Sequence, residues 1–223
     1  MPEKTWKRLI SPQAIKSRIA SMEEWWFDTT RSVHTSGNLN SPRESRVVGQ
    51  VNDSYMYVPA RVTNARAAFR DLPIQNYSKY TFIDLGSGKG RSLFVASELP
   101  FGKVLGVEFV ADLHQQAVDN IARYRPRRQG CRTIESIHGN AAEFEFPNQN
   151  LVVYLFNSFG PEIMRPMLGN LMRSLEQNPR HAILLLLWPE HSDIVAQTPG
   201  LQLYKQTRRH HIYQNAVQPI SAK

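Results

Sequence analysis

The sequence predicts an α/β fold in which helices cover both faces of a mostly parallel, doubly wound sheet. The prediction rests on the alternation of short apolar runs with segments of helical periodicity between residues 81 and 188. Strands and helices that alternate along a chain form βαβ units, whose strands lie parallel. Two short extended runs, 201–205 and 209–213, follow closely enough to pair as a terminal hairpin.

Each parallel strand is predicted from a run of apolar or β-branched residues. The runs at 81–85 and 151–156 are apolar on both faces, as strands at the centre of a parallel sheet are. The other parallel strands are expected at 103–108, 133–138 and 181–188.

The helices are predicted from apolar residues that recur three or four positions apart. The strongest pattern spans 161–177, where seven apolar residues fit one helical face. Residues 111–124 show the same pattern, and 59–70 begins at a proline, which is favoured in a first helical turn. A further helix is expected over 89–99, and a short one follows the fifth strand.

Residues 1–58 are expected to form a helical appendage followed by a cover or a linker. Apolar residues at loosely helical spacing up to Phe27 predict the helix, whereas 29–54 shows no sustained period. Loops of that length commonly act as lids, so we favour a cover over a floppy linker. Because this segment contains few apolar residues, we expect little contribution from it to the core. The main domain is expected at 59–214, followed by a flexible tail at 215–223.

Composition narrows the functional classes. Lys and Arg number 27 against 19 Asp and Glu, a net charge of +8, but the basic residues are scattered without a long basic block. A solvated basic surface is therefore favoured over a dedicated nucleic-acid site. The single cysteine, Cys131, excludes an internal disulfide framework and a cysteine-built zinc site. The longest apolar run, 182–188, is far shorter than the ~20 residues of a membrane-spanning helix. We expect a cytoplasmic protein that uses no metal and no membrane.

The most informative motif is a glycine-rich turn that joins the first strand to the next helix. It reads Asp-Leu-Gly-Ser-Gly-Lys-Gly-Arg over 84–91, and such a turn lets a ligand approach backbone N–H groups at the positive end of a helix. A Walker A loop is excluded because Lys89 is followed by Gly90 instead of Ser or Thr. A dinucleotide fingerprint is excluded because Arg91 occupies the position of its third glycine.

Polar residues at three strand ends indicate the cofactor. Asp84, just before the first glycine, would repel a pyrophosphate but would favour an ammonium group. Glu108, at the end of the second strand, is placed to bind the two hydroxyls of a ribose. Asn140 and Ala141, after the third strand, are candidates for hydrogen bonds to an adenine. S-adenosylmethionine carries all three groups and no phosphate, so it is the predicted cofactor.

These motifs resemble those of the class I S-adenosylmethionine-dependent methyltransferases over about residues 82–213. The resemblance implies a seven-stranded Rossmann-like sheet whose last strand is antiparallel. At one position the chain departs from the family, which commonly has Asp where Asn140 stands. The resemblance also implies cofactor-binding roles for Asp84, Gly86, Ser87, Gly88, Gly90, Glu108, Asn140 and Ala141.

A second motif, Asn-Ser-Phe-Gly-Pro-Glu at 157–162, follows the strand at 151–156. Ligands of open α/β sheets bind at such carboxyl ends. The motif is similar to the Asn-Pro-Pro-aromatic motif of amino-methylating enzymes and to a segment of the disruptor-of-telomeric-silencing type histone lysine methyltransferases. The side-chain carbonyl of Asn157 would accept from an attacking N–H and orient the nitrogen lone pair. The alternative is that Asn157 only caps the following helix.

We therefore predict transfer of a methyl group from S-adenosylmethionine to an amino nitrogen, with Asn157 as the catalytic residue. The resemblance to histone enzymes makes a protein lysine the first choice of acceptor, before an RNA or DNA base or a small molecule. Tyr55, Tyr57 and Phe159 are candidate substrate-binding residues, since aromatic faces attract cationic amines. Half-buried packing is the alternative for the tyrosines. A module that binds the cofactor without catalysis is a further alternative, because the second motif differs from the Asn-Pro-Pro-aromatic motif.

Overall fold

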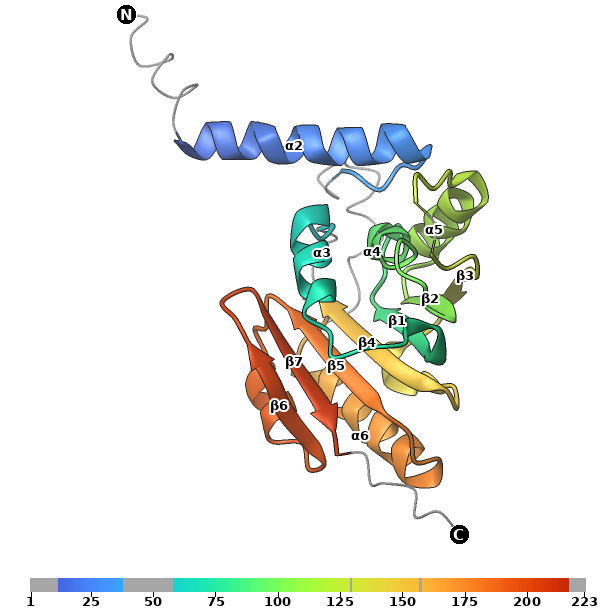
Figure 1. Cartoon of the computed structure of the whole chain (residues 1–223), viewed down its shortest axis with the longest axis vertical. Helices are drawn as coiled ribbons and strands as arrows, with labels where there is room; N and C mark the ends of the chain where they lie inside the picture. Colours follow the sequence, from blue (N-terminus) through green and yellow to red (C-terminus); the bar gives the residue numbers. More distant parts are fainter. Residues whose placement is uncertain (1–11, 38–57, 129, 157, 217–223) are drawn as a thin grey trace, which may run out of the picture.

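A computed structural model describes residues 12–37, 58–128, 130–156 and 158–216, with side chains from residue 21 onward (Figure 1). Within these ranges seven strands form one sheet in the order β3-β2-β1-β4-β5-β7-β6. The candidate residues Tyr55, Tyr57 and Asn157 lie outside the described part of the chain, as does most of the expected cover.

The sheet confirms the predicted architecture. β1, β2, β3, β4 and β5 pair in parallel, whereas β7 is antiparallel to both β5 and β6. Every predicted strand is present, with ends shifted by two residues at most. The strands are β1 (Tyr80–Leu85), β2 (Lys103–Glu108), β3 (Ile134–His138), β4 (Asn150–Phe156), β5 (Ala182–Leu187), β6 (Leu201–Gln206) and β7 (His210–Asn215).

The helices also follow the sequence pattern, but some of their ends differ. α2 continues four residues past Phe27, α3 begins three residues after Pro59, and α4 is shorter at both ends. α4 is shorter than expected because Gly90 adopts a left-handed conformation with φ of 89°, so the helix begins only at Arg91. No helix within the described ranges is both long and apolar enough to cross a membrane. The helices are α2 (Pro12–Arg31), α3 (Val62–Arg70), α4 (Arg91–Ala96), α5 (Ala111–Arg123), α6 (Pro161–Gln177) and α7 (Ser192–Ala196), with 3₁₀ turns η1 (Tyr77–Lys79) and η2 (Ala141–Glu143).

Helices cover both faces of the sheet and enclose two apolar cores (Figure 1). α3, α4 and α5 cover one face, α6 covers the other, and α2 lies across the outer side of the first layer. Successive residues of a strand point to opposite faces. Phe82 therefore belongs to the core on the α3 and α4 side, whereas Ile83 and Leu85 belong to the core on the α6 side.

The end of α2 and the segment after it are part of the folded unit. Phe27 and Val33 are each 1% exposed and belong to the core on the α3 and α4 side. The Arg31 guanidinium donates to Glu98 Oε1 at 2.7 Å and lies over the ring of Phe27. The expectation that residues 29–54 contribute little to the core is therefore wrong for Arg31, Val33 and Thr35. Two of these residues are polar and are buried by their partners, which a count of apolar residues ignores.

Phe27→Ala is expected to lower the free energy of unfolding by about 3–5 kcal/mol, because it removes a fully buried aromatic ring. Trp25→Ala is the control, since Trp25 lies on the same helix and is 66% exposed. Its effect should stay below about 0.5 kcal/mol. Urea unfolding followed by circular dichroism measures both. Equal stability of Phe27→Ala and the wild type would exclude α2 from the folded unit.

Candidate functional site

The candidate site lies at the carboxyl ends of β1, β2 and β4. From β1 the chain adds β2 and β3 toward one edge of the sheet, and then β4 and β5 toward the other. The strand order therefore reverses its direction at β1. Open α/β sheets bind their ligands at such a switch point. The glycine-rich turn, Glu108 and Ser158 meet there.

The glycine-rich turn needs its glycines for conformational reasons. Gly86, Gly88 and Gly90 have φ values of 85°, 54° and 89°, in the left-handed region that favours glycine. The N–H groups of Gly86 and Ser87 donate to the carbonyl oxygen of Val107 at 2.8 and 3.1 Å. The turn is therefore fixed to β2 by its own backbone.

Glu108 connects the turn after β1 with the start of α5. Its Oε2 accepts from the Gly88 N–H at 2.7 Å, and its Oε1 accepts from the Val110 N–H at 2.9 Å. Burial raises the pKa of Glu108, and the backbone hydrogen bonds oppose that rise. Each carboxylate oxygen can accept a second donor, so these contacts are compatible with the predicted binding of ribose hydroxyls.

Asp84 is buried beside the turn with half of its carboxyl group unsatisfied. The Ser92 hydroxyl donates to Oδ2, whereas Oδ1 has no hydrogen-bond partner among the described residues. Burial raises the pKa of Asp84 to about 7, and the nearby Glu108 carboxylate adds to the rise while Ser92 opposes it. The buried Ser87 Oγ also lacks a partner in this part of the chain. Two buried oxygens without a partner within the described ranges, beside a glycine-rich turn, fit the hydrogen-bond donors of a bound S-adenosylmethionine. Its ammonium group would compensate the negative charge of the buried Asp84 carboxylate.

Gly86 has a second role that the sequence did not indicate. A Cβ added at Gly86 would lie 2.4 Å from the Cβ of Ser158, which follows β4. The resemblance assigned this glycine to the approach of a ligand, but in the structure it is Ser158 that approaches. The turn after β1 and the segment after β4 are therefore in direct contact.

Asn140 makes local contacts at the end of β3. Its Oδ1 accepts from the Ala142 N–H at 3.0 Å and caps η2, while its Nδ2 donates to Glu143 Oε1 at 3.3 Å. An adenine amino group would have to share the oxygen with that N–H. Ala141, the other predicted adenine contact, is 7% exposed.

The described part of the expected cover contacts the glycine-rich turn. The Asp28 carboxylate accepts from the N–H and hydroxyl of Thr35 and from the Ser36 N–H, at 2.6–2.9 Å. The buried Arg91 guanidinium donates to the hydroxyls of Thr35 and Ser36, both at 2.8 Å. Lys89 Nζ lies 3.5 Å from the Ser36 carbonyl oxygen. Residues 33–37 are thereby fixed against the start of α4.

Sequence reasoning missed two side chains that hold this segment. Asn120 Nδ2 donates to the carbonyl oxygens of Lys89 and His34, and its Oδ1 accepts from the His34 N–H. Its position three residues after Ala117, on the inner face of α5, was a usable signal. Arg91 was noticed only as a departure from the dinucleotide fingerprint.

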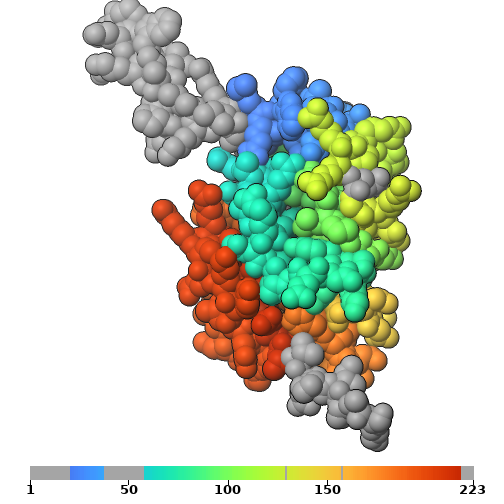
Figure 2. All heavy atoms as spheres, viewed as in Figure 1, coloured from blue at the N-terminus to red at the C-terminus, as the bar shows by residue number. Residues whose placement is uncertain are grey.

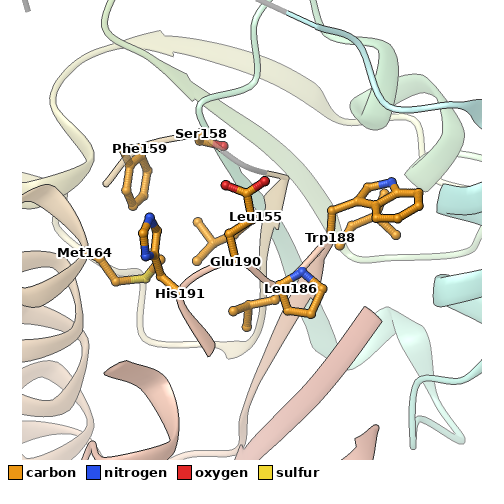
Figure 3. Close-up of a pocket in the computed structure, with 10 residues that line it drawn as sticks. Leu155, Ser158, Phe159, Met164, Leu186, Trp188, Glu190 and His191 are labelled. Carbon is orange, nitrogen blue, oxygen red and sulfur yellow. The ribbon is translucent and has the colours of Figure 1, made fainter. Parts of the chain in front are cut away.

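A small, open pocket lies beyond Ser158, between the ends of β4 and β5 and the starts of α6 and α7 (Figure 3). Figure 3 shows the Glu190 carboxylate on the Ser158 side and the His191 ring beside Phe159. The sequence indicated Phe159 but not Glu190 or His191, although both follow the carboxyl end of β5. The other lining residues are largely apolar: Leu155, Met164, Leu186, Leu187, Trp188 and Pro189.

The sequence matches no protein-family model and no curated protein, but the fold matches solved structures. A protein from Pyrococcus horikoshii is 14% identical, with a TM-score of 0.51 over 72% of this chain and 92% of that one. A predicted N6-adenine-specific DNA methylase from Listeria monocytogenes is 15% identical, with a TM-score of 0.51 over 76% of this chain and 53% of that one. An S-adenosylmethionine-dependent methyltransferase from Leishmania major is 10% identical, with a TM-score of 0.50 over 69% and 70% of the two chains.

These comparisons define the fold. The seven-stranded sheet with antiparallel β7 is the Rossmann-like fold of the S-adenosylmethionine-dependent methyltransferases. The predicted fold class is therefore confirmed.

Asp84 should make the stability of the ligand-free protein depend on pH. Its pKa is about 7 in the folded chain and about 4 when unfolded, so the folded state binds more protons between these values. The contribution of Asp84 to stability is full below pH 4 and is lost as the pH rises through 7. We expect the wild type to lose about 2–3 kcal/mol relative to Asp84→Asn between pH 5 and 8.

Urea unfolding of both proteins at the two pH values measures this difference. The comparison cancels the histidines, whose lowered pKa values act in the opposite direction. A difference that does not change with pH would mean that the Asp84 carboxyl is ionised in the folded protein.

Proposed function

We propose that the chain transfers a methyl group from S-adenosylmethionine to an amino nitrogen, with a protein lysine as the first candidate acceptor. The proposal rests on one observation, the contact at the switch point between the turn after β1 and the segment after β4. The turn that we propose to bind the cofactor and the segment that we propose to hold the acceptor thus lie together at the carboxyl ends of the strands, where open α/β sheets bind ligands. The similar Leishmania major structure is an S-adenosylmethionine-dependent methyltransferase, which supports the choice of cofactor.

The donor side of the site consists of the glycine-rich turn and the residues packed around it. Asp84 Oδ1, which lacks a partner within the described ranges, would accept from the amino group of the methionine moiety. Glu108 would bind the ribose hydroxyls, and Asn140 and Ala141 would lie on the adenine side. Ser87 would donate or accept through its hydroxyl, which has no hydrogen-bond partner among the described residues. When bound, the cofactor supplies an electrophilic methyl group on a sulfonium sulfur.

The pocket beyond Ser158 is the proposed path of the acceptor. Its apolar walls suit an aliphatic stem, and the Glu190 carboxylate and the Phe159 ring suit the cationic end of a lysine. The amine must release a proton before it attacks, and the open side of the pocket leads that proton to solvent. The nitrogen lone pair then forms the new bond to carbon while the carbon–sulfur bond breaks. The task of the protein is to hold the two reactants in line.

Asn157 remains the proposed catalytic residue. In the sequence it stands between the end of β4 and Ser158, whose side chain lies against Gly86. The N-cap residue of α6 is Gly160, three positions later, which weakens the alternative that Asn157 serves as the helix cap. Tyr55 and Tyr57 remain proposed substrate-binding residues on the sequence argument alone.

The distribution of transferred methyl groups tests the function. The purified chain is incubated with tritiated S-adenosylmethionine and a cell lysate, and label is counted in the protein, RNA and small-molecule fractions. We expect label in protein, recovered as methylated lysine after acid hydrolysis. Label confined to RNA would favour a base as acceptor. A chain that binds the cofactor but labels no fraction would be a binding module.

Glu108→Gln is expected to weaken S-adenosylmethionine binding about tenfold to hundredfold, because the loss of charge weakens the hydrogen bonds to the ribose. Glu135→Gln on β3 is the matched control, since this exposed carboxylate pairs with Lys103 at 2.9 Å. Titration calorimetry measures both affinities. If the Glu108 variant folds and binds as tightly as the control, Glu108 is not the ribose ligand.

Asn157→Ala is expected to reduce turnover by ~10²-fold or more, about 2.7 kcal/mol, with cofactor affinity unchanged. The reason is that its contact forms with the reacting nitrogen and matters most near the transition state. Asn157→Asp keeps the shape of the side chain but replaces the neutral amide with a charged carboxylate, so it tests the effect of charge alone. Single-turnover methyl transfer and melting temperature are measured for both variants. A stable, fully active Asn157→Ala enzyme would remove the argument for a nitrogen acceptor.

A further inference from the structure

An arginine-rich segment begins at the C-terminal end of α5. Residues 123–132 contain five arginines and no acidic residue, so the expectation of scattered basic residues is wrong here. Within the described part of the chain, none of their guanidinium groups forms an ion pair with a carboxylate. All five are exposed: Arg123, Arg125, Arg127, Arg128 and Arg132.

The arginine-rich segment contacts the C-terminal part of α2 through Arg125 and Arg127. The Arg125 N–H donates to the carbonyl oxygen of Arg31 at 2.9 Å, and the Arg127 guanidinium lies 4.8 Å from the ring centroid of Trp26. Figure 2 shows blue α2 next to the yellow-green segment around residue 125. Trp25 and Trp26 are 66% and 45% exposed and adjacent in the chain, and contiguous exposed apolar surface is typical of interaction sites.

We propose that this arginine–tryptophan surface, formed by the five arginines together with Trp25 and Trp26, binds single-stranded nucleic acid. Guanidinium groups bind phosphates with paired hydrogen bonds, and indole rings stack on unpaired bases of any sequence. A double helix keeps its base faces covered and would leave the indoles unused. An acidic peptide without aromatic residues would satisfy the arginines but offers no aromatic ring to stack on the tryptophans.

The surface shares no residue with the acceptor pocket. It is closer to the donor side, because Arg123 donates to Asn120 Oδ1 at 3.3 Å and Asn120 donates to the Lys89 carbonyl oxygen at 3.0 Å. A strand bound at the surface is therefore held by contacts outside the acceptor pocket. The proposal goes beyond methyl transfer, and its test uses no cofactor, so either proposal can fail without the other.

Fluorescence anisotropy of the full chain tests the binding. The probes are fluorescein-labelled oligo-uridine and oligo-thymidine of 12 nucleotides, and a glutamate-rich peptide of equal charge. We expect nucleic-acid affinity to fall about a hundredfold between 50 and 200 mM salt if five phosphates are neutralised. The oligonucleotide that binds more tightly shows whether the surface prefers RNA or DNA.

Two sets of variants locate the binding surface. The pair Arg127→Gln and Arg128→Gln should weaken binding at least tenfold. The matched pair Arg165→Gln and Arg173→Gln removes the same charge from exposed positions of α6, on the other face of the sheet, and should change it less than twofold. Trp25→Ala should weaken oligonucleotide binding at least fivefold through lost stacking.

Three outcomes would overturn the proposal. The first is no binding of either oligonucleotide at 50 mM salt. The second is an equal loss of affinity in the two arginine pairs, which would indicate attraction by net charge alone. The third is tighter binding of the acidic peptide than of both oligonucleotides.

Discussion

The Glu108 carboxylate is the interaction on which the geometry of the site depends. It accepts one N–H from the turn after β1 and another from the residue before α5. A buried N–H without a partner costs about 1–3 kcal/mol, so both connections need this carboxylate in place. The shape of the turn is therefore set by the protein itself, before any ligand binds.

The N-terminal segment is joined to the same turn by polar contacts instead of apolar packing. Asp28 holds the backbone after α2, and Arg91 at the first position of α4 holds its hydroxyl groups. In a dinucleotide fold the position of Arg91 would be a glycine, which allows close packing of the helix. Here the long side chain connects the N-terminal segment to the donor side of the site. The departure from the fingerprint thus has a structural purpose.

The sequence was sufficient for the sheet and for α6, because apolar runs and helical periodicity report burial directly. It was less informative where polar groups decide the structure. Arg31 is buried through its ion pair with Glu98, and Thr35 through Asp28, so neither shows in an apolar pattern. The pocket residues Glu190 and His191 could not be assigned because their role depends on which strand ends lie side by side. That arrangement follows from the strand order, which no single segment encodes.

The close approach of Ser158 to Gly86 has a consequence for how such an enzyme can diverge. Even a single methyl group at Gly86 would collide with Ser158, so neither side of the contact can grow unless the other retreats. In the proposed reaction this contact would join the acceptor side to the donor side. A larger side chain at either position would then require a compensating substitution at the other, so changes in acceptor and donor recognition would be coupled at this boundary.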